Sequence, residues 1–146
     1  MYRSQLILFV VAGWLVLIGC GSTAAPSSTD PARAPRQNPN VTSSELAVIL
    51  QQPDPPFLLD VRTLPESQAA SIPGTDALIP VDQLAQRVHE LDPNQEIIIY
   101  CRSGNRSGQA LNILKQSGFT NVRHLAGGIN TWQGQVVSGI SPCVGC

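Results

Sequence analysis

The residues best suited to chemistry lie in the stretch IIIYCRSGNRSG, residues 97–108. A run of β-forming residues ends at Cys101, and a short polar loop with two arginines then leads into a helical pattern. The backbone N–H groups of such a loop can turn inward, and together with the helix N-terminus they attract negative charge. Arg102 and Arg106 add full positive charges. We therefore expect the pKa of the Cys101 thiol to lie below that of a free cysteine, which makes the sulfur a nucleophile.

The other loop residues suit a sulfur that takes up a group from an anionic donor and carries it. Gly104 allows tight curvature, and the hydroxyls of Ser103 and Ser107 can donate hydrogen bonds. Cys101 is the predicted catalytic residue, and the predicted substrate-binding residues are Arg102, Ser103, Gly104, Asn105, Arg106 and Ser107. The alternative is an inert thiol, because free cysteines often pack in protein cores.

The segments around this loop predict an α/β domain. Short apolar runs indicate strands, and helical patterns separate them. The strands are expected at 57–61, 96–100 and 121–125. The helices are expected after Thr42, at 65–70, at 83–90 and from 106 or 107 to 117, and a glycine turn is expected to lead into a last short helix within 127–132. This alternation predicts a central parallel sheet with helices on both faces. Ligands bind beyond the carboxyl ends of the strands in such sheets, which is where Cys101 lies.

Local signals mark the ends of several helices. Thr42 and Glu45 have the spacing of a capping box, in which each side chain satisfies a backbone N–H of the first turn. Asp82 can cap the helix expected from residue 83. Gly118 stands where a glycine commonly ends a helix.

Four motifs in this order resemble those of a single rhodanese-like domain. They are LLDVR (58–62), IPG (72–74), YCRSGNRS (100–107) and LAGGINTW (125–132), and the resemblance covers about residues 41–133. It implies a sulfurtransferase that needs no cofactor. A sulfane sulfur would pass from a donor such as thiosulfate to Cys101 as a persulfide, and cyanide or a thiol would then remove it. Residues 102–107 match the loop that cradles this persulfide.

The chain departs from the family pattern between its first two motifs. Ser71 stands where many relatives have a histidine, and Ser67 stands where an aromatic residue is usual. The stretch after Gly74 is also one residue longer. These changes lie away from the loop, so we expect them to alter local packing and the rim of the pocket and to leave the nucleophile in place.

Several charged residues are interpreted as supports for the loop. Arg106 is expected to form a salt bridge with Asp60 or Glu66 and so to brace it. Asp60 and Arg62 are expected to be scaffold residues that take no part in the reaction.

The histidines and Trp132 are given no chemical role. His89 and His124 have no partner at catalytic or metal-ligand spacing, so each is interpreted as a surface or helix-face residue. Trp132 is expected to anchor packing. The cysteines are few and far apart, so no metal site is expected.

The N-terminal residues have the composition of a targeting segment. Arg3 precedes an almost wholly apolar run from Leu6 to Ile18, which at about thirteen residues is short for a membrane span of roughly twenty. The pattern is typical of a secretory signal, and a short transmembrane anchor is the less favoured alternative. The sequence LIGC at 17–20 resembles the lipobox of bacterial lipoproteins, which implies a signal peptide at 1–19 and lipidation of Cys20.

The expected organisation follows from these segments. Residues 20–40 are rich in Ser, Thr, Ala and Pro and cannot offset the entropy of ordering, so they are expected to form a lipid-anchored flexible linker. The rhodanese-like domain is expected at 41–135 and a C-terminal tail at 136–146. The predicted location is the cell envelope, extracytoplasmic, and on the periplasmic side in a diderm.

The tail ends in a C-x-x-C pair, Cys143 and Cys146. The favoured interpretation is a local disulfide, which persists in an oxidising compartment. The alternative is a mobile dithiol that takes sulfur from Cys101 as a relay.

Composition disfavours one class of partner, and the sequence leaves alternative functions to be weighed. The formal net charge is −1 and the nine basic residues are scattered, which disfavours nucleic acid. The expected partners are a small anionic sulfur donor, a thiol or cyanide acceptor, and a membrane through the lipid. A thiol-redox protein and a non-enzymatic sulfur-binding module are alternatives. A phosphatase is disfavoured, because phosphatases that resemble this fold use C-x5-R, whereas Cys101 and Arg106 form C-x4-R.

Overall fold

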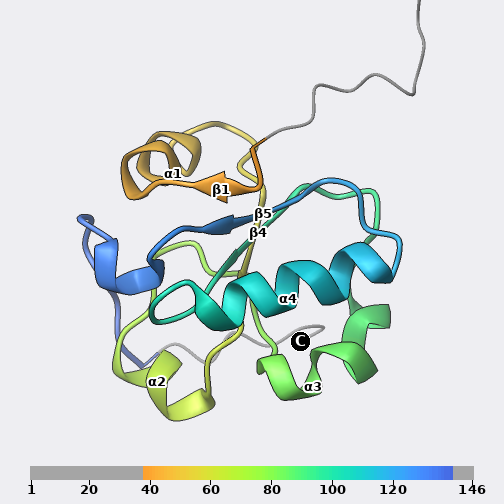
Figure 1. Cartoon of the computed structure of the whole chain (residues 1–146). Coiled ribbons are helices and arrows are strands. Elements are labelled where there is room, and N and C mark those ends of the chain that lie inside the picture. The colour runs from red at the N-terminus through yellow and green to blue at the C-terminus, as the bar shows by residue number, and fades with distance from the viewer. Residues whose placement is uncertain (1–37, 140–146) are drawn as a thin grey trace, which may run out of the picture. The chain divides into compact units, whose positions relative to one another are not determined.

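The computed structural model describes residues 38–139, which form a five-stranded parallel sheet with helices around it (Figure 1). The strand order is β1-β5-β4-β2-β3. The strands are β1 (Asn40–Val41), β2 (Phe57–Asp60), β3 (Ala77–Leu78), β4 (Ile97–Tyr100) and β5 (Val122–Leu125). The predicted α/β class with a parallel sheet is confirmed. The segments that carry the predicted signal peptide, Cys20, Cys143 and Cys146 lie outside the described residues.

The three longer strands occupy the predicted positions to within one residue. Strand β4 lies in the middle of the sheet, with β2 on one side and β5 on the other. In the register, Ile97 stands beside Phe57 of β2 and Val122 of β5. Strands β1 and β3 were not predicted, because two residues are too few to show a periodic pattern. None of the helices between residues 38 and 139 is long and apolar enough to cross a membrane.

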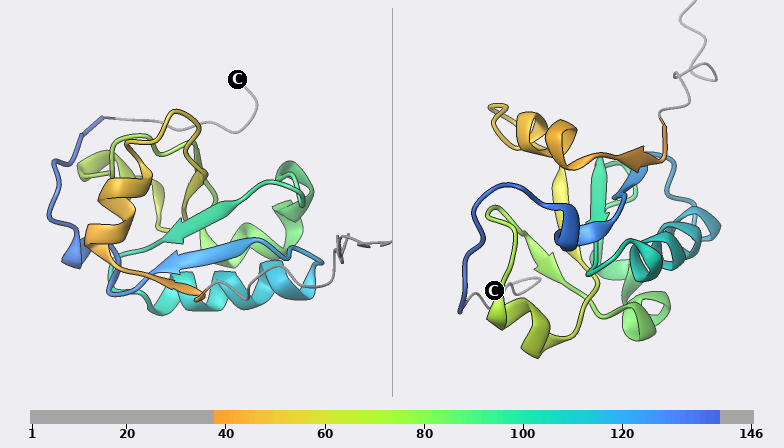
Figure 2. Two further views of the ribbon diagram at one scale, coloured as in Figure 1. Left: turned by 90° about the horizontal axis from the view of Figure 1, so that it is seen from above. Right: turned by 60° about the vertical axis from the view of Figure 1, so that its left-hand side comes forward.

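Helices cover both faces of the sheet, as predicted. They are α1 (Ser43–Ile49), α2 (Leu64–Ala69), α3 (Val81–Arg87) and α4 (Asn105–Gln116), with short 3₁₀ turns η1 (Val88–Glu90) and η2 (Gly128–Thr131). Helices α3 and α4 lie on one face of the sheet, and α1 lies on the other (Figure 1, Figure 2). Side chains of α3 and α4 belong to one apolar cluster, and those of α1 and η2 belong to the other.

The alternation of side chains along β4 places the thiol. Ile97 and Ile99 belong to the apolar cluster under α3 and α4, whereas Ile98 and Tyr100 belong to the cluster under α1. Successive side chains of a strand point to opposite faces. Cys101 continues this alternation and packs on the α3 and α4 side.

Most of the predicted helix ends are correct. Thr42 and Glu45 form the capping box, with the Thr42 N–H donating to Glu45 Oε2 at 2.7 Å and the Glu45 N–H donating to Thr42 Oγ1 at 3.3 Å. Gly118 follows α4 with a φ of +94°. The prediction for Asp82 is wrong: α3 begins at Val81, because the Gln83 N–H already donates to the Pro80 carbonyl at 2.8 Å, and Asp82 therefore lies inside the first turn.

Candidate active site

Cys101 lies at the carboxyl end of β4, directly before the loop that leads into α4. Its side chain is buried, and its Sγ accepts a hydrogen bond from the Gly104 N–H at 3.1 Å. The Ser107 Oγ lies 3.6 Å from the same sulfur. The sulfur therefore sits among donors at the N-terminus of a twelve-residue helix.

The environment of the sulfur lowers the pKa of the thiol. Burial acts to raise the pKa of Cys101, but hydrogen bonds from the Ser107 hydroxyl and from the backbone N–H groups of Ser107, Ser103 and Gly104 outweigh it. The partial positive charge at the start of α4 acts in the same direction as the hydrogen bonds. This direction agrees with the sequence-based expectation, and it increases the fraction of Cys101 that is present as the nucleophilic thiolate.

The turn at residues 125–132, called the LAGG turn below, holds the backbone of the Cys101 loop through two hydrogen bonds. The Ile129 N–H donates to the Cys101 carbonyl at 2.8 Å, and the Asn130 N–H donates to the Arg102 carbonyl at 3.0 Å. Gly128 permits this approach, because a Cβ at that position would lie 2.4 Å from the Cys101 carbonyl oxygen. Two motifs about twenty-five residues apart in the sequence thus fix one loop.

Arg106 braces the loop against α2 through Glu66, which is one of the two partners expected for it. Its guanidinium donates to Glu66 Oε2 at 2.7 Å and to Glu66 Oε1 at 2.6 Å. Glu66 also accepts from the Thr63 N–H at 3.1 Å, so the carboxylate ties the start of α2 to the start of α4. Arg106 is therefore occupied by α2, whereas Arg102, Ser103 and Asn105 are exposed.

Asp60 and Arg62 form the buried scaffold that was expected of them. Arg62 Nη2 lies 2.6 Å from Asp60 Oδ2, and the same nitrogen donates to the Ala70 carbonyl at 2.7 Å. Arg62 Nη1 donates to the Glu66 carbonyl at 3.3 Å. The pair therefore holds the last turn of α2 against β2, on which the Glu66 brace depends.

The expectation for His124 is wrong. His124 lies on β5, partly buried, and its two ring nitrogens are both engaged. Its Nδ1 lies 3.1 Å from Ser107 Oγ, and its Nε2 lies 2.8 Å from Asn40 Oδ1. The contact was missed because it joins a strand, a helix and the two-residue β1, which are far apart in the sequence. The other histidine, His89, is exposed on η1 as expected.

The departures from the family pattern have local effects, as expected. Ser67 and Ser71 are both buried, and their hydroxyls lie 3.0 Å apart. The Ser71 backbone pairs with Val137 through two hydrogen bonds of 2.8 and 2.9 Å, and the Gly139 N–H donates to the Gln68 carbonyl at 2.8 Å. The segment after η2 therefore runs along α2. Trp132 is partly buried against the α1 cluster, in agreement with its predicted packing role.

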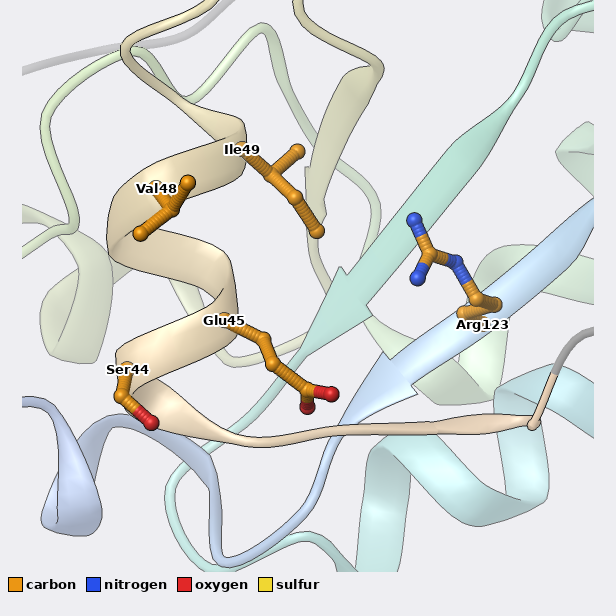
Figure 3. A pocket seen from close by; sticks show the side chains of 5 residues that line it. All are labelled: Ser44, Glu45, Val48, Ile49 and Arg123. Carbon is orange, nitrogen blue, oxygen red and sulfur yellow. The ribbon is translucent and has the colours of Figure 1, made fainter.

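A hollow of about 430 Å³ lies between α1 and β5 (Figure 3). Its lining residues are Ser44, Glu45, Val48, Ile49 and Arg123. None of them belongs to the Cys101 loop, and none is a nucleophile of the kind that the loop presents. The candidate active site is therefore the Cys101 thiol with its donors, and the hollow is a separate feature.

Known proteins similar to this chain belong to the family that its motifs resemble. Residues 42–135 match the family model described as the rhodanese-like domain. The chain is 40% identical over 78 residues to the putative sulfur carrier protein YrkF of Bacillus subtilis, an alignment that covers 53% of this chain and only 42% of that protein. It is 38% identical over 93 residues to a sulfurtransferase of Allochromatium vinosum, which covers 63% of this chain and 85% of that protein.

A solved structure shows the same fold. The human single-domain sulfurtransferase TSTD1 is 28% identical, with a TM-score of 0.58 over 65% of this chain and 95% of that chain. The relatives therefore include sulfurtransferases and a putative sulfur carrier. The family model covers more than half of the residues and includes the entire Cys101 loop. The chain belongs to the rhodanese-like domain family.

Proposed function

We propose that Cys101 accepts a sulfane sulfur from a small anionic donor such as thiosulfate and passes it to cyanide or to a thiol. The observation that carries the proposal is the Cys101 sulfur itself: a buried thiol at the end of β4, with the Gly104 N–H donating to it and with the N-terminus of α4 beside it. The sulfurtransferases among the relatives support the same activity.

The reaction is a double displacement at sulfur. The Cys101 thiolate attacks the outer sulfur of thiosulfate, the S–S bond of the donor breaks, and sulfite leaves with the electron pair. The product is a persulfide anion on Cys101. Cyanide or a thiolate then attacks the outer sulfur, the new S–S bond breaks, and Cys101 regains its thiolate, so that neither half needs an external oxidant or reductant.

The loop supports both halves of this reaction by charge. The backbone N–H groups and the helix N-terminus that lower the thiol pKa also stabilise the terminal sulfur of a persulfide anion. Arg102 is exposed and can attract the anionic donor, whereas Arg106 is held by Glu66 and keeps the loop in place.

The test is the intact mass of the purified full chain before and after thiosulfate. We expect a gain of one sulfur atom, its loss on addition of cyanide, and the formation of thiocyanate. Cys101→Ser should remove both the mass gain and the turnover, while the other cysteines of the chain remain. Turnover that persists in Cys101→Ser would overturn the proposal.

A sulfur-carrier function is the second candidate, since the relative from Bacillus subtilis is named as a putative carrier. A carrier would gain the sulfur atom but would not turn over repeatedly with cyanide or a small thiol. Steady-state thiocyanate formation over many equivalents of enzyme supports the transferase. Loading without turnover supports the carrier, and both outcomes require Cys101.

A further inference from the structure

A chain of polar contacts leads from the buried sulfur to the exposed edge of the sheet. Cys101 Sγ lies 3.6 Å from Ser107 Oγ, Ser107 Oγ lies 3.1 Å from His124 Nδ1, and His124 Nε2 lies 2.8 Å from Asn40 Oδ1. The four residues come from the end of β4, from α4, from β5 and from β1. Cys101 is buried, His124 is partly buried and Asn40 is exposed, so the chain runs from inside to outside.

The donors and acceptors along this chain are ordered by the Asn40 contact. With Asn40 Oδ1 as acceptor, His124 Nε2 carries a proton, and in the neutral imidazole Nδ1 then carries a lone pair. That lone pair can accept the Ser107 hydroxyl proton. The Ser107 oxygen is in turn free to accept from the Cys101 S–H. Each hydrogen bond in this series of contacts is therefore donated in the direction away from the sulfur.

We propose that the Cys101 thiol gives its proton to His124 through Ser107, and that His124 is a positioning residue for the thiolate. The S–H bond breaks and its electron pair stays on sulfur. The proton moves to Ser107 Oγ while the proton of that hydroxyl moves to His124 Nδ1, so Ser107 is unchanged. The products are a thiolate and an imidazolium, and the hydrogen bonds now run from Nδ1–H to Ser107 and from Ser107 to sulfur.

Two features of its surroundings act on the charge of His124. Burial lowers the pKa of His124, and the positive charge of Lys115 on α4 lowers it further. Among the neighbouring elements, β4 contributes Cys101 as the other titratable group, and β1 contributes the uncharged Asn40. The inference rests on the proposed function in one respect, namely that Cys101 acts as a thiolate.

A purely structural role makes a different prediction. The single hydroxyl proton of Ser107 has an alternative acceptor in the Gly104 carbonyl, which lies 3.1 Å from Ser107 Oγ within the first turn of α4. If that contact were the whole role of Ser107, His124 would only pack against α4, and its protonation would be independent of the sulfur. The two roles are therefore distinguished by whether the two groups titrate together.

The experiment measures the alkylation of Cys101 by iodoacetamide against pH, with the Cys101 peptide quantified by mass spectrometry. The variants are His124→Asn, whose amide oxygen can still accept from Ser107 but takes up no proton, and His89→Asn, a matched control at the exposed histidine. We expect two steps in the profile of the wild type and of His89→Asn. His124→Asn should show a single step, with an apparent thiol pKa about one unit higher. Below that pKa the alkylation rate should therefore be about tenfold lower than in the wild type.

A second readout does not depend on reactivity. The pKa of His124 is measured by NMR in the wild type and in Cys101→Ala, and both measurements are repeated with Ser107→Ala, with His89 as the internal reference. We expect Cys101→Ala to change the pKa of His124, and the Ser107→Ala background to abolish that change. An unchanged alkylation profile in His124→Asn, together with a His124 pKa that is indifferent to Cys101, would overturn the inference. Neither readout uses a sulfur donor, so failure of the proposed sulfur transfer would be seen separately.

Discussion

The ion pair between Glu66 and Arg106 can be removed by Glu66→Gln, which keeps the shape of the side chain and removes its charge. Arg106 donates to both carboxylate oxygens at 2.7 and 2.6 Å, and the Thr63 N–H and hydroxyl donate to Oε2 at 3.1 and 2.9 Å. The hydrogen bonds from Arg106 are the largest cause that lowers the pKa of Glu66 to about 2, from an ordinary value of 4.5. Burial opposes them, and the contacts with Thr63 add to them.

The size of the effect on stability is bounded from two sides. A pKa of about 2 in place of 4.5 corresponds to a ceiling of roughly 3 kcal/mol at neutral pH, at about 1.4 kcal/mol for each tenfold change. Both side chains are 31% exposed, so solvent screens the pair, and exposed pairs contribute about 0.2–1 kcal/mol. We expect Glu66→Gln to lower the free energy of unfolding by about 1 kcal/mol at pH 7.

The pH dependence has a definite sign. A carboxyl whose pKa is depressed by folding stabilises the folded state above its unfolded pKa, and this contribution is lost as the pH falls through the folded pKa. The difference in unfolding free energy between the wild type and Glu66→Gln should therefore be complete at pH 7, decrease below about pH 4.5, be small at pH 2 and vanish below it.

The assay is urea unfolding followed by circular dichroism, since urea adds no salt that would screen the pair. Glu90→Gln is the matched control, because Glu90 pairs with Arg87 within one short segment away from the loop. Only Glu66→Gln should also change the alkylation rate of Cys101. Equal unfolding free energies at pH 7, or a difference that persists undiminished at pH 2, would refute the reasoning.

The remaining predictions concern the LAGG turn and the two terminal segments. Gly128→Ala should lower the unfolding free energy by about 2–4 kcal/mol, because the new Cβ clashes with the Cys101 carbonyl. Gly74 also has a positive φ, but a Cβ there would meet no atom within 4 Å, so Gly74→Ala should lower the unfolding free energy by only about 1 kcal/mol in the same urea assay. Radiolabelled fatty acid should enter the expressed protein, and Cys20→Ala should abolish the label; a labelled mutant would contradict the lipobox assignment. Cys143 and Cys146 should be isolated as a disulfide, and Cys143→Ser/Cys146→Ser should leave thiosulfate-to-cyanide transfer largely intact. A double mutant that loads sulfur but cannot release it to cyanide would instead identify the tail as a relay.

Local signals were sufficient for the parts of the fold that carry the thiol. Strand β4 is a run of four β-forming residues, and α4 has a regular apolar stripe that ends at Gly118, so both could be predicted from neighbouring residues alone. Strands β1 and β3 form by pairing with β5 and β2. Each has only two residues, which is too short for a sequence pattern that would predict this pairing. The start of α3 was placed too late because Asp82 is a good cap by type, whereas the first helical hydrogen bond is made at Pro80.

In the candidate site, too, contacts between residues close in the sequence could be predicted and most contacts between distant residues could not. The thiol and its donors could be predicted because they lie within one short loop, and for Arg106 the sequence predicted a pair with Asp60 or Glu66, of which the structure shows Glu66. The contacts of His124 could not be predicted, because its partner Asn40 lies 84 residues away in the sequence and meets it only through the register of β1 with β5. Asn40 also fell in the segment expected to be a linker.

The contacts at the two ends of the described structure limit how far the domain can be shortened. The family match ends at residue 135, yet the backbone of the buried Ser71 is satisfied by Val137. At the other end the match begins at residue 42, whereas the His124 N–H donates to the Pro39 carbonyl. A protein trimmed to the family boundaries would leave the N–H and C=O of Ser71 without partners and would open one edge of the sheet. The melting temperature and the thiol reactivity of such a fragment would then differ from those of the native site, which needs at least residues 39–137.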